Sequence, residues 1–206
     1  PPGTEGVYST ITAAVADLNL RGVSGPVRFL FNDVSYTVGE TYPITVDIAN
    51  ENVPTAVNTV TFKPNTGVTT SISGASTSSI FKFNGSDYII IDGSNAISGT
   101  TKDLTIANTS TASSAVFHIV SLGTGTGATN NTIKNCIINS SSSGVASYGI
   151  SVGGSTLGTS GADNDGNTFQ NNTITGTSVG IYSVGNASVT SGGNDNLLIT
   201  QNTITV

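Results

Sequence analysis

The stretch NTIKNCIIN, Asn131–Asn139, recurs twice more before the end of the chain. NTFQNNTIT occupies Asn167–Thr175, and NLLITQNTIT occupies Asn196–Thr205. The copies are separated by 36 and then 30 residues, a period typical of proteins whose repeats stack into a solenoid. Each copy holds two short β-like stretches around a bend, and a unit of this size cannot bury its own apolar face. The repeat therefore predicts a stack of coils, each held by its neighbours.

Alignment of the three copies places amide side chains at the bend of every unit. They occupy two successive positions: Asn135, Asn171 and Gln201 at the first, then Asn172 and Asn202 at the second. The first copy has Cys136 at the second position. Stacked amides can bond to one another and to the backbone groups that a tight turn leaves unpaired. We expect these residues to form a structural ladder rather than a ligand site.

A helical apolar period occurs at residues 9–20, where Ile11, Ala14, Val15 and Leu18 form one stripe. The first coil of a solenoid exposes unpaired backbone, so we expect residues 1–25 to form an N-terminal cap containing this helix. Residues 26–206 are then the coils of a single domain. The final coil begins at Asn202 and has no covering segment. We expect this C-terminal end to be open, and to be covered by self-association or by further domains.

The composition excludes several classes of function. The net charge is −6, with only 6 Lys and Arg residues against 12 Asp and Glu, so no basic patch is available for nucleic acid. No apolar run approaches the length of a membrane span. Cys136 is the only cysteine, which excludes an intrachain disulfide. Because Lys134 is the only cationic residue close to it in sequence, Cys136 is expected to be a small residue in a turn or in the core.

Two consecutive phrases resemble a known family. DYIIIDG at Asp87–Gly93, followed by KDLTIAN at Lys102–Asn108, resembles the opening coils of right-handed parallel β-helix proteins such as pectate lyases, polygalacturonases and phage tailspikes. Residues Tyr8–Val38 resemble the cap of large secreted Bacteroidetes-type surface proteins. The resemblance implies an all-β, right-handed, three-faced parallel β-helix solenoid and an extracellular or cell-surface location. It implies no particular activity, because one fold hosts many functions.

Acidic residues in two corresponding loops are the candidate metal ligands. Asp163, Asp165 and Asp195 lie in these loops, and the phrase DNDGN from Asp163 resembles the first half of a calcium loop without its closing Glu. Asp165 and Asp195 are one local repeat apart, so they are expected to stack at about 5 Å. Two such carboxylates share a cation, share a proton or turn into solvent. We expect either solvated loop acids or a Ca²⁺ site, and no other cofactor.

Other reactive side chains are scattered. His118 alternates with apolar residues and is expected to face outward as a surface or hydrogen-bonding residue rather than a ligand. Lys134 is expected to face outward without an acidic partner in its own strand. Tyr148 and Tyr182 lie near corresponding Gly-Ile positions, so they are expected on one face, where exposed rings can stack on sugars. No nucleophile motif of the G-x-S-x-G type is present. These residues do not assemble a catalytic constellation in the sequence.

Three functions fit this pattern. The first is a non-catalytic extracellular structural or adhesive protein: a surface stalk, a surface layer or a self-assembling fibre (filament) subunit. The second is a carbohydrate-active or carbohydrate-binding domain acting on polysaccharide, which requires Asp163, Asp165 and Asp195 to converge with Tyr182 beside a groove. The third, ice or crystal binding, requires regular Thr rows. It ranks last, because Thr173 and Thr203 have no counterpart at Ile137.

Overall fold

Three parallel sheets contain all the strands of the described residues. The computed structural model describes residues 7–49, 51–141 and 146–206. Sheet A contains β1 (Val27–Phe31), β4 (Val60–Pro64), β7 (Ile89–Asp92), β10 (Thr132–Lys134), β13 (Thr168–Gln170) and β16 (Leu198–Thr200). Sheet B contains β2 (Ser35–Tyr36), β5 (Thr70–Gly74), β8 (Leu104–Asn108), β11 (Cys136–Ser140), β14 (Thr173–Thr175) and β17 (Thr203–Thr205). Sheet C contains β3 (Ile44–Val46), β6 (Phe81–Asn84), β9 (Ser114–Val120), β12 (Ser147–Gly153) and β15 (Val179–Ser183).

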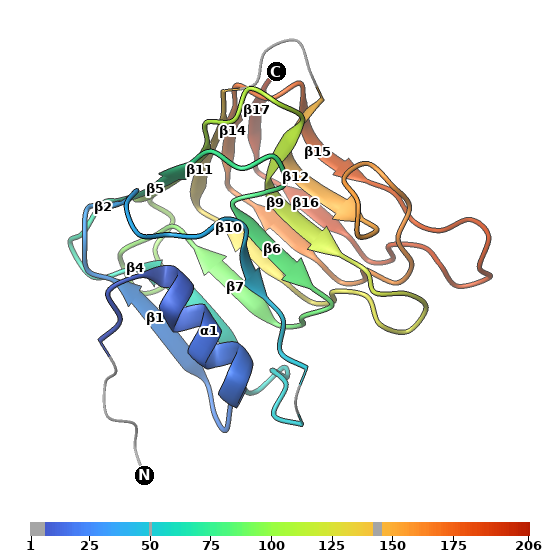
Figure 1. The fold of residues 1–206 in the computed structure, drawn as a ribbon, viewed down its shortest axis with the longest axis horizontal. Coiled ribbons are helices and arrows are strands. Elements are labelled where there is room, and N and C mark those ends of the chain that lie inside the picture. Colours follow the sequence, from blue (N-terminus) through green and yellow to red (C-terminus); the bar gives the residue numbers. More distant parts are fainter. Residues whose placement is uncertain (1–6, 50, 142–145) are drawn as a thin grey trace.

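Each strand lies between the strands three before and three after it, so the chain visits sheets A, B and C in turn. This is a three-faced parallel β-solenoid of about five turns, as the repeat predicts (Figure 1). The register also agrees with the alignment of the repeats. Ile133 pairs with Phe169 and then with Ile199 in sheet A. Ile138 pairs with Ile174 and then with Ile204 in sheet B.

The core is a column of apolar side chains inside the coils. Alternate residues of the short strands point inward, and Phe62, Phe81, Phe83 and Phe117 are no more than 1% exposed. The rings of Phe81 and Phe117 stack with centroids 5.8 Å apart. Inward positions thus repeat along the stack, and burial of large aromatic side chains supplies much of its stability.

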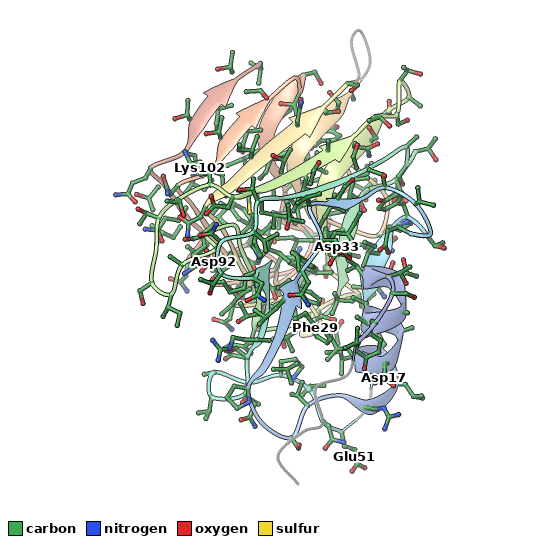
Figure 2. The ribbon with its side chains drawn as sticks, turned by 90° about the vertical axis from the view of Figure 1, so that its left-hand side faces the viewer. Asp17, Phe29, Asp33, Glu51, Asp92 and Lys102 are labelled. Carbon is green, nitrogen blue, oxygen red and sulfur yellow. The ribbon has the colours of Figure 1, made fainter. Side chains whose placement is uncertain are left out.

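One helix, α1 (Ile11–Arg21), lies across the N-terminal end of the coils (Figure 1). Its four predicted stripe residues are buried against the core. The helix begins two residues later than predicted because the Thr10 hydroxyl caps it, accepting the N–H of Ala13. Gly22, at φ 64°, ends it. Figure 2 shows Asp17 on α1 and Phe29 on β1 at this covered end of the stack.

The C-terminal coil is built differently from the coils before it. Its strands β15, β16 and β17 each pair on one side only. The inward residues Ile199 and Ile204 are 48% and 44% exposed, whereas Phe169 and Ile174, at the same positions one coil earlier, are fully buried. An apolar cross-section of the solenoid is therefore exposed at this end of the chain.

Candidate functional site

The first bend position of each repeat adopts left-handed backbone geometry. Asn135, Asn171 and Gln201 have φ angles of 59°, 53° and 58°, a region that asparagine tolerates better than most residues. Asn171 Nδ2 donates to Asn135 Oδ1 at 2.8 Å. Gln201 does not continue this contact, because its Oε1 accepts from Gln170 Nε2 at 3.1 Å. The side-chain amides of Asn135 and Asn171 are thus bonded directly to each other. The longer side chain of Gln201 is bonded to Gln170 instead of to Asn171.

The second bend position links neighbouring coils through backbone groups. Asn172 Oδ1 accepts the N–H of Cys136 at 3.0 Å, and Asn172 Nδ2 donates to the carbonyl of Ile133 at 2.9 Å. Asn202 repeats the arrangement one coil later, with the N–H of Asn172 at 2.9 Å and the carbonyl of Phe169 at 2.7 Å. Each of these amides satisfies two backbone groups of the preceding coil.

Cys136 begins this second column and takes part in it only through its backbone. The side chain is completely buried, and burial raises the pKa of the thiol far above its ordinary value. A thiol held in its protonated form is a poor nucleophile. Cys136 is therefore a packing residue at the start of the column.

Two further asparagine columns were not anticipated from the sequence. Asn167 Oδ1 accepts the N–H of Asn131 at 2.9 Å, and Asn131 Oδ1 accepts the N–H of Ile89 at 2.9 Å. In the same way, Asn164 Oδ1 accepts the N–H of Ala128 at 3.0 Å. Asn131 and Asn167 are 36 residues apart, which is the repeat distance itself. The spacing was therefore a signal that could have revealed them.

The three predicted loop acids line one groove. Asp163, Asp165 and Asp195 border a depression of about 630 Å³, together with Asp87 from an earlier coil. The carboxylates of Asp163 and Asp165 also accept hydrogen bonds from backbone groups. Asp163 Oδ2 accepts the N–H of Gly125 at 2.6 Å, and Asp165 Oδ1 accepts the N–H of Asp195 at 2.7 Å. The acids thus connect the loops of successive coils.

Asp87 is the member of this groove that sequence reasoning missed. Its Oδ1 accepts the N–H of Thr129 at 2.6 Å. Burial raises the pKa of the Asp87 carboxyl, and the hydrogen bonds from Thr129 partly offset that rise. Asp87 lies 76 residues before Asp163 and outside the repeated phrases, so only the folded loops bring it to the groove.

Calcium binding by Asp163, Asp165 and Asp195 stays a prediction. Among residues 7–49, 51–141 and 146–206, no group of three or more His, Cys, Asp or Glu side chains is close enough to hold a metal ion. The prediction is that millimolar calcium raises the melting temperature relative to EDTA, because a ligand bound only by the folded state stabilises it. Asp165→Asn should abolish that shift, and Asp33→Asn, at an exposed site elsewhere, should preserve it. Equal melting temperatures in calcium and EDTA would exclude the site.

His118 was expected to face outward as a surface or hydrogen-bonding residue; the structure confirms the outward direction and a hydrogen bond, but the side chain is buried rather than at the surface. Its side chain does face away from the coil core, level with Lys82 and Ser151 on the adjacent strands. The segment after β12 covers it, however, and leaves it 2% exposed. Nε2 lies 3.0 Å from the carbonyl of Gly154, so this nitrogen carries the proton and donates it. Nδ1 and the hydroxyl of Ser151 are both buried without a partner.

Acid should weaken the fold through His118. Burial is the main cause that lowers the pKa of the imidazole to about 4; the hydrogen bond to the Gly154 carbonyl opposes this shift, and the charge of the nearby Lys82 contributes to it. The unfolded chain, with a His118 pKa near 6.5, binds this proton first, so the contribution of neutral His118 to stability is lost as pH falls from about 6.5 towards 4. His118→Gln retains a donor for Gly154 and does not titrate. As pH falls over that range, the wild type should therefore lose unfolding free energy relative to this variant in urea titrations, and parallel pH profiles would contradict it.

The remaining sequence candidates are placed as follows. Lys134 does have an acidic partner, although on a neighbouring strand: its Nζ lies 3.3 Å from Asp92 Oδ2 (Figure 2 labels Asp92). Tyr148 and Tyr182 share one face, with ring centroids 5.3 Å apart. The Tyr182 hydroxyl donates to the carbonyl of Gly158, and Tyr182 does not border the acidic groove. The tyrosines and the acids therefore form separate surfaces.

The outer row of sheet B is interrupted, as the sequence indicates. Register places Thr105, Ile137, Thr173 and Thr203 side by side, so one apolar residue divides the hydroxyls. Lys102 Nζ also donates to the hydroxyl of Thr173 at 3.0 Å (Lys102 is labelled in Figure 2). This row does not offer the uniform hydroxyl surface that ice or crystal binding requires.

No protein-family model, curated protein or solved structure matches this chain. The single helix of the described residues spans 11 residues and is too short and too polar to cross a membrane.

Proposed function

We propose that this chain is a non-catalytic structural or adhesive segment of an extracellular surface protein. One observation carries the proposal: the C-terminal coil presents its inward residues Ile199 and Ile204 about half exposed, whereas the coil before it buries Phe169 and Ile174 at the same positions completely. Such a surface is stabilised by contact with another β-coil. The likeness of Asp87–Gly93 and Lys102–Asn108 to large secreted bacterial β-helix proteins supports an extracellular location.

The polar side chains support the same reading. The buried asparagines at the bends donate to and accept from backbone groups of adjacent coils, so their chemistry is already used within the fold. Cys136 is held as a protonated thiol, and His118 is covered. These asparagines, Cys136 and His118 are therefore engaged within the fold or out of reach of a substrate, as in a structural stack.

Copies of the chain would associate through their C-terminal coils. Within residues 7–49, 51–141 and 146–206, the inward strand residues are most exposed at this end, whereas α1 packs beside the first coil, whose inward Phe29 is half-buried. The outward side of α1 carries Ala13, Asp17 and Arg21. A helix offers no free strand edge on which another coil could stack. Contact between two like ends closes a pair, whereas a filament built by coil stacking would require two uncovered ends. The expected assembly is thus a dimer, from which larger structures would need lateral contacts.

Sedimentation velocity over a range of concentrations tests this proposal. We expect the wild-type chain to dimerise reversibly as concentration rises, and Ile204→Asp to remain monomeric, since it places a charge on the exposed cross-section. Val38→Asp is the matched control, because Val38 is 88% exposed and lies in an early coil. A wild-type chain that stays monomeric at all concentrations, or a control variant that dissociates equally, would contradict self-association and favour the second candidate.

The second candidate is carbohydrate binding or cleavage at the acidic groove. The observation in its favour is that Asp87, Asp163, Asp165 and Asp195 line one depression. Carboxylates in a groove can accept hydrogen bonds from sugar hydroxyls or act as acid and base in glycoside hydrolysis. Binding and reducing-sugar assays with neutral polysaccharides test it: Asp163→Asn should lose any signal that Asp33→Asn retains. The absence of both binding and cleavage would exclude it.

A further inference from the structure

Two of the six basic residues of this acidic chain meet at one small depression. Arg28 lies on β1 and Lys63 on the adjacent strand β4, both on the outer side of sheet A. The register pairs Leu30 with Lys63, which places Arg28 two residues along from that pair. In a chain with 12 Asp and Glu residues, two neighbouring cations form an unusual concentration of positive charge.

The depression has the size of a small polar group. It measures about 70 Å³, whereas a water molecule occupies roughly 30 Å³ in the liquid. Its lining combines the two cations, amide and hydroxyl groups, and an apolar rim: Arg28, Lys63, Asn65, Thr66, Asn95, Leu30, Pro64 and Ile97. No Asp or Glu is part of this lining. The depression is thus lined by two cationic residues and by neutral polar and apolar residues, and by no acidic residue.

Lys63 is the least ordinary of these residues. Its side chain is 7% exposed, and its Nζ donates to the carbonyl of Ala96 at 3.0 Å. An ammonium has three donors, so this neutral acceptor leaves donor capacity and the charge itself uncompensated. The ion pairs found within the described ranges are Asp17–Arg21 and Asp92–Lys134, and neither includes Arg28 or Lys63.

The nearest carboxylate on the sheet is already engaged. Asp92 follows Ile91, the partner of Phe62, and is therefore level with Lys63. Its Oδ2 contacts Lys134 at 3.3 Å, and its Oδ1 accepts from Asn135 and from the N–H of Ser94. Lys63 instead turns towards Ala96 and the depression.

The amides around the depression are fixed by their own contacts. Asn65 Nδ2 donates to Asn32 and its Oδ1 accepts the N–H of Thr66, while Asn95 Nδ2 donates to the carbonyl of Val68. These bonds hold the loops after β4 and β7 beside the two cations before any ligand arrives. A lining fixed in this way favours binding because less ordering is required when a ligand arrives.

We propose that this depression binds an oxyanion group, a carboxylate, sulfate or phosphate, between Lys63 and Arg28. Guanidinium and ammonium groups are the side chains that bind such groups best, and Arg28 can do so with two parallel bonds. Leu30, 44% exposed, and Ile97, 81% exposed, would contact the apolar part of the molecule that carries the anion. This site is separate from the C-terminal coil and does not depend on self-association.

Calorimetric titration with sulfate, phosphate and acetate, at constant ionic strength set with chloride, tests the proposal. We expect saturable binding of one oxyanion per chain, weakened about tenfold or more in Arg28→Gln, as expected for the loss of a charged hydrogen bond. Arg21→Gln is the matched control: it removes the same charge at an exposed site and should bind like wild type. Arg28→Lys, which keeps the charge, should bind the oxyanion with intermediate affinity. This variant replaces Arg28→Gln in the titration if Arg28→Gln does not fold.

Two further titrants identify the source of the anion. Tighter binding of a carboxylated polysaccharide than of a neutral one would assign the group to an acidic glycan, and binding of free anions alone would assign it to a small molecule. Non-saturable binding, or equal affinity in wild type and Arg28→Gln, would overturn the proposal.

Discussion

Asn172→Ala is expected to lower the free energy of unfolding by about 2–6 kcal/mol. The substitution leaves the N–H of Cys136 and the carbonyl of Ile133 unpaired, and each buried unsatisfied group costs about 1–3 kcal/mol. Both groups lie where water cannot replace the lost amide, because Asn172 and Cys136 are fully buried. Urea denaturation followed by circular dichroism measures the change.

Asn139→Ala is the matched control for that variant. Asn139 lies one strand position beyond Ile138 and is exposed on the outer face of β11. A surface substitution of this kind changes stability by less than about 0.5 kcal/mol. Equal losses in the two variants would show that the buried amide is not what links the coils.

Phe117→Ala is expected to cost about 3–5 kcal/mol, the usual range for removing a buried phenyl ring. The Phe117 ring is 1% exposed, stacks on Phe81 and meets Phe83 edge-on at 6.4 Å. Its removal opens a cavity in the middle of the column, where coils on both sides are fixed by their strand pairing and collapse is restricted. Differential scanning calorimetry together with urea denaturation measures the loss.

Phe29→Ala provides the comparison for the core substitution. Phe29 also stacks on a neighbouring ring, Phe62, at 4.8 Å, but it lies on the first coil and is only half-buried. Its loss should therefore be clearly smaller. If Phe29→Ala is as damaging as Phe117→Ala, stability is not concentrated in the central column as the burial pattern indicates.

The repeated phrase was sufficient to predict the solenoid and its register. The 36- and 30-residue spacings placed Ile133, Phe169 and Ile199 in one column, and the structure pairs them so. This succeeds because contacts in a solenoid are made between equivalent positions of adjacent repeats. The apolar stripe of α1 was also predicted correctly, because helical periodicity is a local property of the sequence.

The surface sites were less predictable because they depend on how loops fold back. His118 is covered by the segment after β12, 36 residues away at Gly154, and strand alternation alone gave no sign of this. Asp87 and Asp163 lie in the same groove only because loops of different coils project together. The pairing of Arg28 with Lys63 needed the register of β1 and β4, which lie outside the clear repeats.

Native-state hydrogen exchange tests most directly whether asparagine side chains hold the coils together. The N–H groups of Cys136, Asn131 and Ile89 are bonded to side-chain oxygens of asparagines. We expect them to exchange as slowly as the strand amides of the central coils, through opening of the whole stack. Exchange of these three N–H groups at the rate of exposed loop amides would contradict the claim.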